Sequence, residues 1–416
     1  MPMNDGCPCV AITGLGVVSP IGIGRDAFWT ALSAGKSGIA ALPATAADVP
    51  RLAAQLPEFS ARDYIRSSNL RRADALSRNI AAAARMALAD AGLAGAPAPV
   101  ERVGIVIGSA LGNVHESAQY LERLFTKGPS LVSPMMFPNL VLNAPASYAA
   151  MEIGCTGANL TVSQGEVSGE QAIAVAVDLI RAGRADVVLA GGGDELAGVV
   201  TAGYRDYYAL SSQRGGPEWC SPYDVDRNGV ILGEGAAMLV CESTAHARQR
   251  RAAVYADLVD YASFAVPAPA YDWPARAPTA TARLQELLEN SWGAGCDSGG
   301  VDLVCGSANS SLRLDACEVD VLTRVFGEAA GHVALTSIKG AIGEFGAAGA
   351  LTAVATCLAL RDGVVPPLCN MRRPLADTPF RFAARRGERR ELRRALMTST
   401  ARGGSCVALL FQRSGA

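Results

Sequence analysis

The chain has 416 residues, half of them hydrophobic, so it is long enough to bury a large core in about two domains or one duplicated unit. Its 37 lysine and arginine residues nearly balance its 39 aspartate and glutamate residues. This balance excludes an overall charge that would draw the chain to nucleic acid or a membrane surface, and neither is predicted as a partner. The start of the chain lacks a basic region followed by an apolar core, and we expect a cytoplasmic protein.

The predicted elements alternate between short β-branched runs and alanine-rich helical stretches, which is typical of an α/β protein with buried strands. In chain order we expect a strand at 10–14, a helix and turn at 27–39, a long helix at 71–93 that ends at Gly92, a strand at 102–109, a loop and helix at 112–125, an apolar loop at 131–154, and a helix at 172–180.

Two later segments resemble each other, which indicates a duplicated architecture. Residues 185–196 and 301–312 each read as a buried strand followed by a loop of small residues, and 102–113 has a similar ending. A proline- and alanine-rich stretch at 264–282 separates the two expected halves. We place the boundary just before it, near residue 250, which gives halves at 1–250 and 251–416.

Cysteine and histidine are not arranged as metal ligands. The eleven cysteines are scattered, and only Cys7 and Cys9 lie close together, so neither a zinc site nor a disulfide framework is predicted. The three histidines are also far apart. His115 follows a strand, His246 lies on a polar helical face where we expect it to be solvated, and His332 precedes a strand as a structural residue. No metal or cofactor is predicted.

The sequence GLGVVS after the first strand resembles a dinucleotide-binding fingerprint through Gly14 and Gly16. The third glycine position holds Ser19, and Pro20 interrupts the expected helix. A plain turn between a strand and a helix is therefore favoured over a nucleotide site.

Alternating aspartates at 223–229 resemble the start of a calcium loop, but the terminal glutamate is missing at the required spacing. We expect Asp224 and Asp226 to cap the turn or to pair with Arg227. A second charged stretch, at 381–394, contains seven arginines and two glutamates. It predicts either a solvated turn between strands or a docking surface for an acidic partner.

The sequence TVSQGEVSGEQAI at 161–173 has the form of an active-site turn. A β-branched run ends at Val162, and Glu166 stands just before a helix, at a place where a nucleophile is expected.

Eight blocks in the same order resemble the elongating β-ketoacyl-acyl carrier protein synthases. The resemblance implies the thiolase fold, an α/β fold in which two similar halves form a five-layered α/β/α/β/α sandwich and the protein assembles as a dimer. The blocks are VAITGLGVVSPIG, FWTALSAGKSGI, RRADALSRNIAAAARMALADAGL, VGIVIGS, SPYDVDRNGVILGEGAAMLVCE, IKGAIGEFGAAGA, VPPLCNM and GGSCVALLF.

The resemblance also implies which residues carry the chemistry. In that family a cysteine at a helix N-terminus holds the acyl chain as a thioester, two histidines assist decarboxylation, and a lysine orients the second histidine. In this sequence the cysteine position falls on Glu166, and the histidine positions fall on Ser307 and Glu344. Lys339 alone of this set is retained.

A carboxylate at a helix N-terminus is stabilised by about 0.3 to 1 kcal/mol, which makes Glu166 a poor acyl nucleophile. Ser307 and Glu344 cannot replace two imidazoles near neutral pH. Because Glu166 and Glu344 are expected to face each other across the pocket, either a cation such as Lys339 lies between them or one carboxyl is protonated. The family's gate loop reads Ala-Arg-Gly-Gly here, with Arg402 at the phenylalanine position, followed by Gly403 and Gly404.

These replacements predict a subunit without condensing activity of its own, similar to the chain length factors of type II polyketide synthases. The resemblance implies a heterodimer with an active ketosynthase, an acyl carrier protein that delivers the chain, and a polyketide or polyene product, including aryl polyenes. Residues near the implied interface are candidates for limiting chain length by their volume, with plain core packing as the alternative. They are Leu111, Met135, Met136 and Phe137.

Three other functions are open from the sequence. A divergent decarboxylase or hydrolase would use Glu166 or Glu344 as acid or base. A homodimeric scaffold would bind a carrier protein through 381–394. A dinucleotide-binding enzyme requires the fingerprint that Ser19 and Pro20 interrupt.

Overall fold

The computed structural model describes residues 9–42, 51–66, 72–95, 100–292, 300–376, 378–383 and 386–415. Within these ranges one large sheet contains eleven strands. Two short strand pairs lie outside it, β3 (Ile39–Ala41) with β4 (Leu52–Ala54) and β12 (Val364–Val365) with β13 (Glu388–Arg389). The strands of the large sheet are β1 (Val10–Ser19), β2 (Gly22–Ile23), β5 (Val103–Gly108), β6 (Asn159–Val162), β7 (Val187–Asp194), β8 (Gly235–Ser243), β9 (Ala256–Ala265), β10 (Leu303–Cys305), β11 (Ala334–Thr336), β14 (Arg394–Thr400) and β15 (Ser405–Gln412).

Helices cover and separate these strands. The α-helices are α1 (Arg25–Ser33), α2 (Ala75–Asp90), α3 (Val114–Lys127), α4 (Ala144–Ile153), α5 (Ser168–Arg181), α6 (Gly198–Asp206), α7 (Thr244–Gln249), α8 (Pro278–Trp292), α9 (Leu312–Phe326), α10 (Lys339–Ile342) and α11 (Ala348–Asp362). The 3-10 helices are η1 (Ala61–Asp63), η3 (Val100–Arg102), η4 (Pro129–Leu131), η5 (Pro134–Asn139), η7 (Gly327–His332) and η8 (Arg402–Gly404). None of the helices in these ranges is long and apolar enough to cross a membrane.

The large sheet consists of two halves with the same strand order. The order is β6-β5-β7-β8-β1 in the first half and β11-β10-β14-β15-β9 in the second. In each half the first three strands are parallel, and each later strand is antiparallel to its neighbour. The halves meet where β1 pairs with β9 through Val10, Ala11 and Ile12. We propose that the boundary between the halves lies at about residue 250, between α7 and β9.

The stronger of the two sequence similarities joins two strands that are not equivalent in the fold. Residues 185–196 contain β7, whereas 301–312 contain β10. By strand order the counterpart of β10 is β5, which lies in 102–113. The duplication is present, but the weaker of the two sequence similarities marks the equivalent strands.

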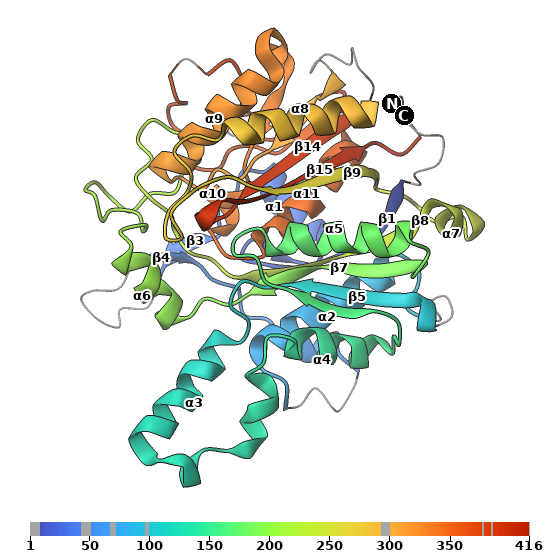
Figure 1. Ribbon diagram of the computed structural model, residues 1–416, viewed down its shortest axis with the longest axis vertical. Coiled ribbons are helices and arrows are strands. Elements are labelled where there is room, and N and C mark those ends of the chain that lie inside the picture. Colours follow the sequence, from blue (N-terminus) through green and yellow to red (C-terminus); the bar gives the residue numbers. More distant parts are fainter. Residues whose placement is uncertain are drawn as a thin grey trace.

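Figure 1 shows that the helices and the two half-sheets form five layers. Helices α2 and α4 cover the outer face of the first half-sheet, and α8 and α9 cover that of the second. Helices α5 and α11 lie between the half-sheets and contact both. From Ala348 to Leu360, α11 is buried at every residue, as its apolar composition on all sides predicts. This is the sandwich that the resemblance implies.

Three of the differences between the predicted boundaries and the structure have a clear physical cause. The strand expected at 10–14 continues to Ser19, because all ten residues of β1 are buried and its pairing with β8 continues to Val18. The helix expected at 71–93 is shorter, since Asp74 accepts the Ser77 N–H and caps α2. The apolar loop expected at 131–154 contains η5 and the buried helix α4, whose alanines pack against α2 and β5.

Helix α3 extends away from the sandwich together with η4 and η5 (Figure 1), and we call residues 114–139 the arm. No residue of α3 is buried, although several of its side chains are large and apolar. The arm therefore exposes apolar surface that the rest of this chain does not cover.

The glycines of the dinucleotide-like sequence have a packing role. A Cβ at Gly16 would lie 1.9 Å from the Ala83 carbonyl oxygen, and one at Gly14 would lie 2.3 Å from that of Ala87. The two glycines thus let β1 approach α2 closely, which explains them without a nucleotide.

The close approach makes a stability prediction. Gly16→Ala should lower the free energy of unfolding by about 1 to 3 kcal/mol, since β1 and α2 must separate to admit the methyl group. Gly95→Ala is the matched control, because a Cβ there meets nothing within 4 Å. Urea denaturation of both variants measures the difference, and equal stabilities would contradict the packing role.

Candidate functional site

A pocket of about 120 Å³ lies where the turn before α5, the end of β7, helix α6 and the loop after α10 meet. Its walls are mainly apolar. Glu166, Tyr204 and Arg402 are bonded to one another, whereas Asp194 and Glu195 bond to the segment 110–115. The lining residues are Ala110, Leu111, Gly112, Val114, Gly165, Glu166, Asp194, Glu195, Leu196, Val200, Tyr204, Leu232, Gly233, Glu344, Phe345, Gly346 and Arg402.

Glu166 lies two residues before α5 and is almost completely buried. Its Oε1 accepts hydrogen bonds from Arg402 Nε at 2.7 Å and from the Tyr204 hydroxyl at 2.8 Å. Its Oε2 accepts the backbone N–H of Arg402 at 3.1 Å. A carboxylate thus stands at the predicted nucleophile position, and its counter-charge is Arg402, a pairing that the sequence analysis did not foresee.

Aromatic rings hold Arg402 in place. Its guanidinium lies 3.9 Å from the centre of the Tyr204 ring and 5.7 Å from that of Trp273, which favours a cation. Burial, followed by the negative charge of Glu166, raises the pKa of Tyr204 well above its usual range. Tyr204 is therefore protonated and donates its hydroxyl hydrogen to Glu166.

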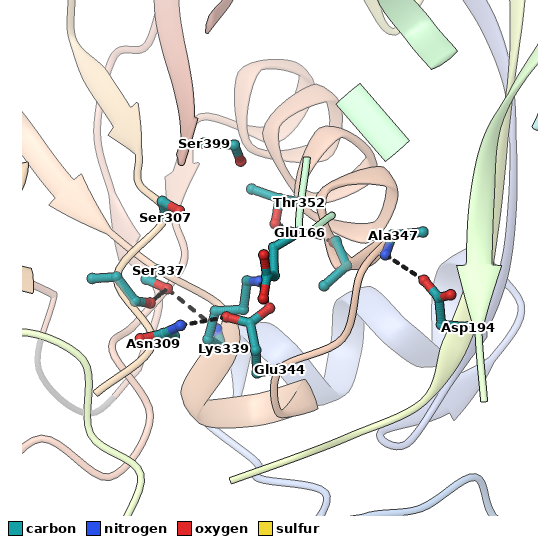
Figure 2. A network of polar contacts seen from close by, with 12 residues as sticks. Glu166, Asp194, Ser307, Asn309, Ser337, Lys339, Glu344, Ala347, Thr352 and Ser399 are labelled. Carbon is teal, nitrogen blue, oxygen red and sulfur yellow. Dashed lines mark hydrogen bonds and ion pairs between the residues drawn. The ribbon is translucent and has the colours of Figure 1, made fainter. Parts of the chain in front are cut away.

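Glu344 has a cation of its own. Lys339 Nζ lies 2.5 Å from its Oε1, and the side-chain amide of Asn309 donates to its Oε2 at 2.6 Å (Figure 2). Burial raises the pKa of Glu344, Lys339 opposes this rise, and the charge of Glu166 adds to it. Two ion pairs therefore replace the single shared cation that the sequence analysis considered.

Ser307, at the second replaced position, has a structural contact. Its Oγ accepts the Thr400 N–H at 3.1 Å, and its own N–H donates to the buried carboxylate of Glu318 at 2.7 Å. The first bond ties the segment after β10 to the end of β14, and the second ties it to α9. The hydroxyl is not part of the pocket lining.

Glu170 is a buried acid in the first turn of α5 that the sequence analysis did not select. The Ser399 hydroxyl donates to its Oε1, and its Oε2 has no hydrogen-bond partner among the described residues. Its carboxyl fits beside Gly349, where a Cβ would overlap it. Burial raises its pKa from the ordinary 4.5 to about 7, and the Ser399 hydroxyl opposes the rise.

Of the four candidates for limiting chain length, the structure brings one to the pocket. Leu111 lines it, whereas Met135, Met136 and Phe137 lie on η5 in the arm and outside the lining. Met135 and Phe137 are exposed on this chain.

The gate loop is bonded to a neighbouring loop. The Gly403 N–H donates to the carbonyl oxygens of Pro269 at 3.1 Å and Asp272 at 3.2 Å. The Val266 N–H donates to the Gly404 carbonyl oxygen at 2.8 Å. These bonds hold Arg402 over the pocket.

The histidines lie elsewhere. His115 is exposed on α3, and its N–H donates to Glu195. His332 ends η7, where its carbonyl oxygen accepts from Arg390. The expectation that His246 is simply solvated is wrong, because its Nδ1 lies 2.5 Å from the buried carboxylate of Glu242.

The other charged motifs also find partners within the chain. Asp224 accepts the N–H groups of Asp226, Arg372 and Arg373, as expected of a capping residue. Its side chain does not pair with Arg227, whose nearest acidic partner is Asp315 at 3.7 Å. In the stretch 381–394, the described side chains of Arg381, Arg386, Arg389 and Arg393 are exposed.

The pocket lacks the groups that condensation requires. Its described lining contains neither cysteine nor histidine, and its acids are fixed by cations or backbone amides. Tyr204, Asn309 and Glu170 complete this arrangement. No motif in the sequence marks any of these three residues.

Comparisons with known proteins give the family of this chain. The family models that match are "Beta-ketoacyl synthase, N-terminal domain" over residues 8–247 and "Beta-ketoacyl synthase, C-terminal domain" over 255–372. The 3-oxoacyl-[acyl-carrier-protein] synthase 2 of Rhizobium meliloti is 33% identical, with 97% of this chain and 98% of the relative covered. That of Coxiella burnetii is 31% identical, with the same coverage.

Solved structures show the same fold. The ishigamide ketosynthase/chain length factor matches with a TM-score of 0.90 and 26% identity, over 99% of this chain and 100% of that one. The Burkholderia phymatum β-ketoacyl synthase matches with a TM-score of 0.87 and 27% identity, over 98% and 99%. The predicted thiolase fold is thereby confirmed. The chain belongs to the β-ketoacyl synthase family.

The ion pair at the nucleophile position should stabilise the fold. Arg402→Met should lower the free energy of unfolding by about 3 kcal/mol, because it leaves the buried Glu166 carboxylate without a cation. The double variant Glu166→Gln/Arg402→Met should recover at least about 1 kcal/mol of that loss, since an amide needs no counter-charge. Urea denaturation of the wild type, of the single variants Arg402→Met and Glu166→Gln, and of the double variant gives the coupling energy. A value near zero would show that the pairing is energetically unimportant.

Glu170 predicts a dependence of stability on pH. Glu170 binds its proton more tightly in the folded protein than in the unfolded chain. The contribution of this proton to the free energy of unfolding is therefore fully present below about pH 4.5 and is lost as the pH rises through about 7. Glu170→Gln cannot ionise and should gain stability relative to the wild type by about 1 to 3 kcal/mol between about pH 5 and pH 8. Denaturation at both pH values tests this, and a constant difference would contradict it.

Proposed function

We propose that this chain is a chain length factor, a non-condensing subunit that pairs with an active ketosynthase and bounds the acyl tunnel in type II polyketide or polyene biosynthesis. One observation carries the proposal. At the nucleophile position stands a carboxylate, Glu166, which Arg402 and Tyr204 hold through three hydrogen bonds. A carboxylate fixed in this way cannot carry the thioester that condensation needs.

The contact with the Arg402 backbone supports the same function. A backbone N–H close to a nucleophile can stabilise the oxyanion of acyl transfer. Here that N–H already donates to Glu166 Oε2. A substrate carbonyl therefore has to compete with a carboxylate for the donor.

The closed gate argues against delivery of a substrate to Glu166. The Arg402 guanidinium contacts the rings of Tyr204 and Trp273, and the next residue, Gly403, bonds to the loop that contains Trp273. Opening this gate exposes Glu166 and separates it from its cation. The cost of that separation favours a chain that receives no acyl group from a carrier protein itself.

The relatives and solved structures are named for two functions, condensation and chain length control. Those from Rhizobium meliloti and Coxiella burnetii are named as 3-oxoacyl-[acyl-carrier-protein] synthases. The solved ishigamide protein includes a chain length factor, and the AntDE:AntF structure, with 26% identity and a TM-score of 0.87, contains a type II polyketide synthase carrier protein with its ketosynthase. Replacement of all three catalytic positions favours the second group.

The arm supplies a face for the partner. Phe125 is 82% exposed, and Leu121, Leu131 and Phe137 are exposed beside it in sequence. Strand β6 lies at the edge of the sheet and bonds to β5 alone among the described strands. An apolar surface and an open sheet edge suit a partner of the same fold. We propose that a carrier protein then delivers the chain to the partner.

A divergent decarboxylase or hydrolase is less well supported. Such an enzyme would use Glu166 or Glu344 as acid or base, and each of these is held in an ion pair. Releasing either carboxylate leaves a buried cation alone, which is unfavourable.

The proposed heterodimer predicts a specific loss on substitution in the arm. Co-expressed with a cysteine-bearing ketosynthase of the same organism, this chain should co-purify as a one-to-one complex. Phe125→Asp should reduce the recovered complex at least about tenfold, because it places a charge in an apolar contact. Affinity purification followed by gel filtration measures the recovery.

Val225→Asp serves as the control, since Val225 is 43% exposed and lies outside the arm. It should leave recovery unchanged. If the wild-type chain purifies as a stable homodimer and does not bind the ketosynthase, the proposed function is wrong. Malonyl decarboxylation by the isolated chain that is lost in Glu166→Ala would instead support the divergent enzyme.

A further inference from the structure

The pocket has a partly exposed entrance and a buried inner end. At the entrance, Leu111 is 53% exposed, Val114 and Val200 are partly exposed, and Glu195 accepts the His115 N–H beside them. Glu166 and Glu344 line the inner end and are almost completely buried. A chain that enters from the side of the arm therefore meets these apolar side chains and Glu195 first, and the ion pairs of Glu166 and Glu344 last.

The inner end keeps unused hydrogen-bonding capacity. Glu166 Oε2 accepts one hydrogen bond from the described residues, the Arg402 N–H at 3.1 Å. A carboxylate oxygen has two lone-pair sites, so Oε2 can accept another hydrogen bond. Oε1 already accepts two. The open acceptor is therefore Oε2.

The charges of the lining favour a donor over an anion. Glu166, Asp194, Glu195 and Glu344 are four acids, and Arg402 is the arginine among the described lining residues. Lys339 adds one cation behind Glu344. An incoming carboxylate meets this excess of acids, whereas a hydroxyl can donate to it.

Resting on the proposed function, we infer that this pocket receives the distal end of the acyl chain held by the partner and selects chains that end in a hydroxyl group. A terminal methyl group displaces water from the ion pair and returns no hydrogen bond. A terminal hydroxyl replaces that water by donating to Glu166 Oε2. The lost nucleophile position thereby becomes a specificity site.

Two small probes of the same shape test the selection without a partner. Purified chain is titrated with 4-methylphenol and with 1,4-dimethylbenzene, which differ by one hydroxyl, and binding is followed by ligand-observed NMR. The quantity compared between proteins is the ratio of the two dissociation constants, because it removes the difference in hydration of the free probes. In the wild type the phenol should bind at least as tightly as the hydrocarbon.

The double variant Glu166→Leu/Arg402→Leu removes both charges together and avoids a lone buried ion. In it the preference for the phenol should fall at least about tenfold, as expected when a hydrogen bond to a charged acceptor is lost. Val199→Ala is the matched control, since Val199 is 53% exposed and lies outside the pocket lining, and it should leave the ratio unchanged. The inference is overturned if the double variant keeps the wild-type ratio within about twofold or if the wild type binds neither probe.

This result is separable from the proposed function. Selective binding by a chain that forms no heterodimer would support the hydroxyl-binding site and contradict the proposed chain length factor function. A heterodimer whose pocket does not discriminate between the probes would support the proposed function and contradict the hydroxyl-binding site.

Discussion

A charge buried in a protein has to be matched, and this requirement organises the site. Glu166 stands at the start of a helix between two half-sheets, where little water can reach it. The chain supplies Arg402 from the gate loop, and Tyr204 and Trp273 provide ring faces for that cation. Glu344 is matched separately by Lys339. The scaffold of a thiol enzyme thus accommodates two carboxylates because each brings a cation with it.

The duplicated sandwich makes such an exchange possible without loss of the fold. Helices α5 and α11 are held by sheets on both sides, so residues at their starts are positioned by packing and not by the chemistry of the site. Glycines at the close approaches, such as Gly16 against Ala83, preserve this packing. The catalytic positions are then free to change as long as charge and volume are satisfied.

Much of the fold could be predicted from the sequence because it depends on local patterns and on resemblance over the whole chain. The alternation of buried strands and helices and the turn before α5 are both visible in the printed residues. That Glu166, Ser307 and Glu344 stand at the family's catalytic positions stays a prediction. Helix α4 was missed because the apolar stretch before it contains two prolines, which suggested a loop throughout.

The partners of the replaced residues were harder to predict, because they depend on distances between remote segments. Arg402 lies 236 residues after Glu166 and was noted only as a change in the gate loop. Asn309 and Tyr204 carry no motif, and Glu170 looks like an ordinary acid in the first turn of a helix. The position of His246 on a polar helical face predicts a solvated side chain, and its partner Glu242 belongs to the preceding strand, β8.

The double attachment of Arg402 to Glu166 also bears on how such a protein can evolve. If residue 166 reverted to cysteine, the Arg402 guanidinium would remain buried without its carboxylate, and if residue 402 reverted first, the carboxylate would be left alone. Both single steps pass through a less stable protein. Residues 166 and 402 are therefore expected to change together in evolution, because a change at either position alone lowers the stability of the protein.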